Sequence, residues 1–103
     1  MFYIQFIEQL EKRGFIVHEG LESYTLVFQD KLHKTHELNN VLIQLDKSGD
    51  SIHYRFKKTN PEKSNRDDLV DLTGYADNFK KLNDTYAGFI NAIKVIARKN
   101  ARF

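Results

Sequence analysis

Clustered side chains that could bind a metal ion are the first candidates for chemistry in this sequence. Asp67, Asp68 and Asp71 would share one face of a helix, and hard cations such as Mg²⁺ prefer grouped carboxylates. His33 and His36 have the imidazole groups that transition metals favour. Aspartates at the start of a helix also stabilise its dipole, and histidines in a polar segment usually face water. We therefore predict no metal site and no cofactor.

Residue patterns typical of enzymes are also missing from the sequence. There is no glycine-rich phosphate-binding loop, no nucleophile elbow centred on serine, and no cysteine. The carboxylates and histidines have no spacing that marks a pair for acid–base catalysis. We therefore expect no catalytic residues and a function that is not enzymatic.

The composition is that of one soluble domain. The chain has 103 residues, of which 41% are hydrophobic and 29% charged, and its formal net charge is +2. This length supports one hydrophobic core, so we predict a single α+β domain over residues 1–103. No apolar run approaches the roughly 20 residues of a membrane span. The absence of cysteine fits a reducing compartment, and we expect a cytoplasmic protein with no membrane contact.

The amino-terminal segment has the pattern of a short amphipathic helix. Tyr3, Phe6, Ile7 and Leu10 follow the spacing that places apolar groups on one helical face. Gly14 then supplies a residue that tolerates the left-handed backbone after a helix. We predict a helix that ends before Gly14.

The next apolar residues alternate in two pairs of runs, which indicates two β-hairpins. A two-residue turn at Gly20–Leu21 would place Val17 opposite Tyr24. A turn at Ser48–Gly49, or a four-residue loop over residues 47–50, would place Leu45 opposite Ile52. In both hairpins the large apolar side chains share one face, whereas a one-residue slip would turn them outward. We predict a four-stranded antiparallel sheet, with a polar loop or single helical turn over residues 30–40.

The last third of the chain has apolar residues at helical spacing. Residues 64–67 have the form of a capping box, and the pattern then continues toward the carboxyl end. An unbroken helix over residues 65–101 would be about 55 Å long, more than a small sheet can cover. Two alternatives are open: a continuous helix, or a helix pair broken within residues 82–85 or at Gly74. We predict that this long helix or helix pair packs on one face of the sheet.

Together, these patterns predict one apolar core. Its members come from the first helix, the inward face of each strand and the start of the last helix. They are Phe6, Ile7, Leu10, Phe15, Val17, Leu26, Phe28, Ile43, Leu45, Ile52, Tyr54, Phe56, Leu72, Ala76 and Phe79.

The excess of apolar surface on the last helix favours a protein partner. Monomers rarely expose large apolar patches, so we expect a homodimer through this helix or a bound protein of unknown identity. A small cysteine-free chain of this composition fits a regulatory or inhibitory module, such as a phage or mobile-element accessory protein that blocks a host protein. The residues expected to contact a partner are Tyr75, Tyr86, Phe89, Ile90 and Ile93.

The alternative function is binding of nucleic acid through the outer face of the sheet. A row of basic residues on one strand, with further lysines near it, could neutralise phosphates. The sequence pI of about 8.8 is modest for such a domain. The residues in question are His53, Arg55, Lys57, Lys58, Lys31 and Lys34.

Overall fold

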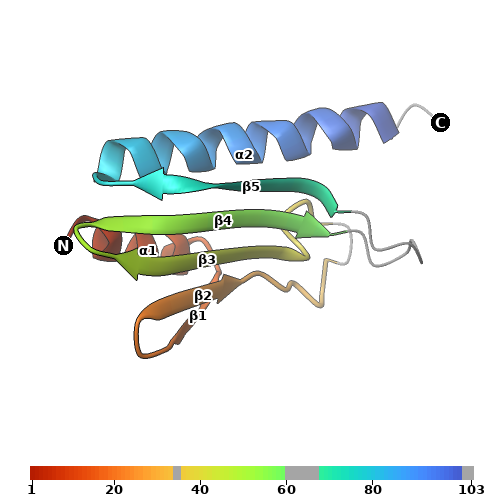
Figure 1. Ribbon diagram of the computed structural model, residues 1–103. Coiled ribbons are helices and arrows are strands. Elements are labelled where there is room, and N and C mark those ends of the chain that lie inside the picture. Colours follow the sequence, from red (N-terminus) through yellow and green to blue (C-terminus); the bar gives the residue numbers. More distant parts are fainter. Residues whose placement is uncertain (34–35, 60–67, 101–103) are drawn as a thin grey trace.

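Two helices and a five-stranded antiparallel sheet form the two layers of this computed structural model, which describes residues 1–33, 36–59 and 68–100 (Figure 1). The strands follow one another across the sheet in the order β1-β2-β3-β4-β5. The α+β class is confirmed, but the sheet has one strand more than the four predicted. The elements are α1 (Phe2–Lys12), β1 (Ile16–Glu19), β2 (Ser23–Val27), β3 (Val41–Ser48), β4 (Ser51–Thr59), β5 (Asp68–Ala76) and α2 (Phe79–Asn100).

Helix α1 forms where the apolar spacing predicted it. Tyr3, Phe6, Ile7 and Leu10 are its buried residues, so its apolar stripe faces the core. After its last turn Gly14 has a φ of +104°, a backbone conformation that glycine adopts without a steric penalty. The chain can therefore reverse into β1 immediately after α1.

The first hairpin has the predicted faces but a different register. Val17 pairs with Leu26 and not with Tyr24, because the two-residue turn is Leu21–Glu22, one residue later than predicted. The amide of Gly20 donates to the carbonyl of Ser23 over 2.7 Å and closes this turn. A shift of two residues leaves every side chain on its face of the sheet, since side chains alternate with a period of two.

The second hairpin differs from its prediction in the same way. Leu45 pairs with Tyr54 and not with Ile52, and Ser48 pairs with Ser51. Gly49, with a φ of +61°, takes the first position of the two-residue turn. Because only glycine adopts this conformation without strain, the turn lies one residue later than Ser48–Gly49.

Strand β5 replaces the first part of the predicted long helix. Asp68–Ala76 pairs with β4, with one irregularity in the register between Lys58 and Thr59, and Gly74 lies opposite Tyr54 within the strand. The prediction of a helix over this stretch was therefore wrong, and Gly74 does not break one. The proposed capping box, residues 64–67, lies outside the described residues.

Helix α2 is a single continuous helix that runs back alongside β5 (Figure 1). It begins after Asn78, whose side-chain oxygen accepts a hydrogen bond of 2.8 Å from the amide of Lys81. This is the contact of an N-cap residue. Residues 82–85, where we considered a break, lie within the helix. Within the described part of the chain, no helix is long and apolar enough to cross a membrane.

Both helices pack on the same face of the sheet. Phe6 of α1 lies 5.7 Å from Tyr86 of α2, and Phe56 of β4 lies 5.7 Å from Phe89 of α2, as distances between ring centroids. Most predicted core residues are buried, but Leu72 is 37% exposed, and Val17 and Phe79 are only partly buried. The core also contains residues that the sequence analysis did not include: Tyr3, Tyr24, Val41, Leu82, Tyr86, Phe89 and Ile93.

Candidate binding surface on the sheet

The face of the sheet opposite both helices is left uncovered by the packing of the described residues. We call it the open face. Because α1 and α2 both join the core on the other side, every second residue of each strand points away from them. The open face consists of Ile16, His18, Ser23, Thr25, Val27, Leu42, Gln44, Asp46, His53, Arg55, Lys57, Asp71, Thr73 and Tyr75.

The predicted row of basic residues is present on β4. His53, Arg55 and Lys57 alternate with the buried Tyr54 and Phe56, so all three belong to the open face. This outcome depended only on the period of a β-strand, and the two-residue error in register did not affect it.

Arg55 forms a bidentate ion pair with Asp71 of β5. Its Nε and Nη2 donate to the two carboxylate oxygens over 3.2 and 2.9 Å. The hydrogen bond from Arg55 holds the pKa of Asp71 below its usual value, and the charges of Arg55 and Lys57 act in the same direction, whereas burial opposes them. Lys57 lies directly opposite Asp71 in the register. Two cations and one carboxylate therefore share this part of the open face.

An aromatic pair lies at the other end of β5. His53 and Tyr75 are direct partners in the register, with ring centroids 4.8 Å apart and planes inclined by 43°. Tyr75 is 56% exposed, so its ring offers both an apolar surface and a hydroxyl to a ligand. Of the five residues expected to contact a partner, Tyr75 is the one on the open face, although it lies on a strand and not on a helix.

The other four expected partner residues do not form a surface. Tyr86, Phe89 and Ile93 are buried in the core of the chain, and Ile90 is partly buried against it. The apolar stripe of α2 is thus covered by α1 and the sheet. The expectation of an over-long helix with an uncovered stripe was wrong, because β5 shortens the helix and the remaining stripe is buried.

An aliphatic row crosses the opposite end of the open face. Ile16, Val27 and Leu42 are neighbours on β1, β2 and β3, and Lys57 continues the row on β4. A shallow concavity of about 450 Å³ lies beside them and is lined in part by Asn40. Asn40 has a φ of +67°, a conformation that asparagine tolerates better than most residues. This end of the face combines an apolar floor with amide and cationic groups.

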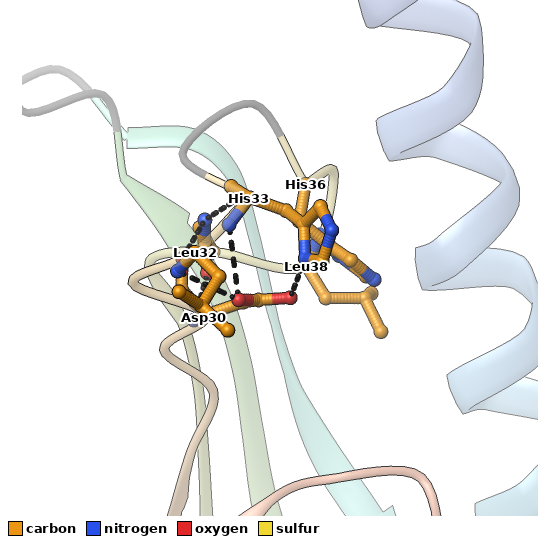
Figure 2. Close-up of polar contacts among 6 residues, drawn as sticks. Asp30, Leu32, His33, His36 and Leu38 are labelled. Atoms are coloured by element: carbon orange, nitrogen blue, oxygen red, sulfur yellow. Dashed lines mark hydrogen bonds and ion pairs between the residues drawn. The ribbon is translucent and has the colours of Figure 1, made fainter.

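The polar loop between β2 and β3 is ordered by its own side chains (Figure 2). The carboxylate of Asp30 accepts hydrogen bonds from the amides of Leu32 and His33 over 3.0 and 3.1 Å, and its second oxygen lies 2.9 Å from His33 Nδ1. The contact with the His33 side chain is the main cause of the lowered pKa of Asp30. The amide of Leu38 donates to His36 Nδ1 over 3.1 Å. The sequence analysis missed this organisation, although an aspartate that bonds amides two and three residues later is a recognised turn signal.

The remaining predicted basic residues do not extend the row on β4. Lys58 lies on the other side of the strand, where its Nζ donates to the carbonyls of Glu37, over 2.9 Å, and Asn39. Burial lowers the pKa of Lys58. Lys31 is exposed in the polar loop. Lys34 lies outside the described residues. Lys58 thus holds the loop in place and does not face a ligand on the open face.

The carboxylates considered for metal binding have other surroundings. Asp68 and Asp71 lie in β5, Asp71 pairs with Arg55, and Asp67 is outside the described residues. Among the residues that the structure describes, no three histidines or acids come together in a way that could hold a metal ion. Comparison of the chain with models of protein families, with curated proteins and with solved structures found no match in any of the three.

Proposed function

We propose that this protein is a non-enzymatic binding module whose open face contacts another protein. The observation that carries the proposal is the one-sided packing, in which two helices cover one face of a five-stranded sheet and leave the other uncovered. A module of this kind acts by occupying its partner, so we propose a regulatory or inhibitory role, which includes the accessory-protein role suggested by the sequence.

The residue types on the open face support a protein partner. Tyr75 and Arg55 belong to the types most often found as anchors in protein interfaces, and the ion pair with Asp71 holds Arg55 in a fixed orientation. The aliphatic row of Ile16, Val27 and Leu42 supplies apolar contact area beside these polar groups. Protein-binding surfaces combine apolar contact area with hydrogen-bonding groups in this way.

Nucleic acid is the second candidate, favoured by the presence of His53, Arg55 and Lys57 in one row on the open face. It has less support, because Asp71 neutralises part of this charge and Lys58 faces the other way. A phosphate backbone requires repeated cations along its path. A protein surface requires only a few anchors.

Capture of partners from the source cell by immobilised variants tests the proposal. A partner of the open face binds the wild-type protein and the Ala87→Asp variant, which has a new carboxylate on the exposed side of α2, but not Leu42→Asp or Tyr75→Ala. Urea unfolding of each variant checks that the fold is retained. Capture of the same proteins by all four would contradict the proposal.

A filter-binding titration of single- and double-stranded oligonucleotides at two salt concentrations tests the second candidate. An affinity for the oligonucleotides that falls steeply with salt concentration would favour nucleic acid over protein. The Lys57→Gln variant should then bind more weakly than the wild type at the same salt concentration.

A further inference from the structure

The two edges of the sheet are protected to different degrees. The edge strand β1 has four residues, whereas the edge strand β5 has nine. An edge strand leaves unpaired N–H and C=O groups on its outer side, and proteins protect such edges by keeping them short or by placing proline or lysine on them. Neither proline nor lysine occurs in β5, and the irregularity in its pairing with β4 is confined to the start of the strand, so the edge from Val70 to Ala76 is regular. This edge is therefore a suitable site for the addition of another strand.

The side chain of Leu72, in the middle of β5, is exposed in a way that a further strand beside β5 would explain. Its register partner is Phe56, and both side chains point toward the helix layer. Phe56 is completely buried, yet Leu72 is 37% exposed, because no described strand lies beyond β5. A further strand at this edge would cover Leu72.

We propose that β5 pairs with β5 of a second copy of this chain, antiparallel and centred on Leu72. A twofold axis perpendicular to the sheet keeps the helices of both copies on one side. In paired antiparallel strands, residues directly opposite each other have their side chains on the same face of the sheet. With this axis, the pairing must therefore be centred on a residue that lies opposite its own equivalent, and not on a point between two residues. Leu72 lies within the part of β5 that pairs regularly with β4, from Val70 to Ala76, so this part of the strand can pair about a centre at Leu72.

The charges of β5 support the same centre. Pairing centred on Leu72 places Asp71 opposite Thr73 of the other copy, and Leu72 opposite its own equivalent. A centre at Asp71 would place two carboxylates directly opposite each other, which is destabilising. A centre at Thr73 would place Leu72 opposite Gly74, which has no side chain to cover it. The arrangement at Leu72 places the two exposed leucines opposite each other, where each covers the other.

This dimer would join two five-stranded sheets into one and make the open faces of both copies continuous. It places self-association at the sheet edge and not on α2, whose apolar stripe is buried within the chain. The inference does not depend on the proposed function, since a dimer requires no other protein.

Sedimentation equilibrium between micromolar and millimolar concentrations tests the proposal. The wild-type protein is expected to reach twice its mass of 12.1 kDa. Leu72→Glu, which places two carboxylates at the centre of the dimer, is expected to weaken dimerisation by at least about tenfold. Leu21→Glu introduces the same charge at a turn residue that is 98% exposed and should dimerise as the wild type does.

A single cysteine gives a second measurement that does not rely on disruption. Because the chain contains no cysteine, Leu72→Cys introduces the only thiol. Residues directly opposite each other in paired strands have Cβ atoms about 5 Å apart, which is close enough for a disulfide between copies. Leu72→Cys should therefore oxidise to a covalent dimer much faster than Leu21→Cys. A wild-type protein that stays monomeric at millimolar concentration, or equal cross-linking at both positions, would overturn the proposal.

Discussion

The ring of Tyr54 on β4 occupies the space above Gly74 on β5, its direct partner in the register. A Cβ atom added at Gly74 would lie 2.7 Å from Tyr54 Cζ, a distance that real contacts do not show. The phenol ring is largely buried and cannot move aside freely. Gly74 is therefore required by the packing of its neighbour, and not, as the sequence suggested, by a break in a helix.

We predict that Gly74→Ala lowers the free energy of unfolding by about 1–3 kcal/mol, because the new methyl group forces the Tyr54 ring from its position. Urea unfolding monitored by circular dichroism measures the change. Gly88→Ala is the matched control, since nothing lies within 4 Å of a Cβ at this helical position. Alanine there should raise the stability by about 0.5–1 kcal/mol. Equal effects of the two substitutions would contradict the assignment of β5.

The error over β5 has a general physical cause. Residues four apart share a face in a helix, with 3.6 residues per turn, and also in a strand, where the period is two. Leu72 and Ala76 have this separation, so the pair fits either structure. Val70, which alternates with Leu72 and Gly74, was the evidence for a strand. Because the helical pattern continues beyond Phe79, the sequence analysis assigned these residues to the same helix.

Other features of the fold followed from the sequence because they depend on periodicity alone. The faces of both hairpins and the row containing Arg55 and Lys57 needed only the alternation of side chains. The partner of Arg55 could not be predicted in the same way, since Asp71 had been placed on a helix. The buried position of Tyr86 was missed for a related reason: with β5 absent from the predicted sheet, no surface remained for this part of the helix to cover.

Substitution of Phe89 tests whether this residue of α2 belongs to the core of one chain or to a contact between two chains. It is completely buried and its ring lies 5.7 Å from that of Phe56, so Phe89→Ala should lower the free energy of unfolding by about 3–5 kcal/mol. Tyr75→Ala, on the open face, should change it by about 1 kcal/mol or less, the range expected for loss of its cross-strand contact with His53. Urea unfolding at several protein concentrations provides both values. A loss of stability in Phe89→Ala that depends strongly on protein concentration would instead place Phe89 in an interface between copies.

The N-terminus of α2 depends on the side chain of Asn78. Its oxygen accepts a hydrogen bond from the Lys81 amide, which has no partner within the helix. Asn78→Ala should therefore lower the free energy of unfolding by about 1 kcal/mol. Asn91→Ala removes the same side chain from an exposed position inside α2 and should leave stability unchanged or slightly raised, because alanine is the better helix former. A larger loss in Asn91→Ala than in Asn78→Ala would show that the helix does not begin at this cap.

The ion pair between Arg55 and Asp71 should appear in the pH dependence of stability. The hydrogen bond from Arg55 lowers the pKa of Asp71 in the folded protein below its ordinary value. As the pH falls, the unfolded chain takes up this proton first, so the stabilisation is present above about pH 4 and is lost as the pH falls through the folded pKa.

The variant Asp71→Asn removes this contribution. Its free energy of unfolding should be lower than that of the wild type at neutral pH, and the two values should approach each other in acid. Urea unfolding at intervals between neutral pH and about pH 3 measures the difference. Asp46→Asn, at an exposed position of β3 on the same side of the sheet, is the matched control and should change the pH dependence less. A difference between Asp71→Asn and the wild type that does not vary with pH would show that Arg55 does not stabilise the charged carboxylate.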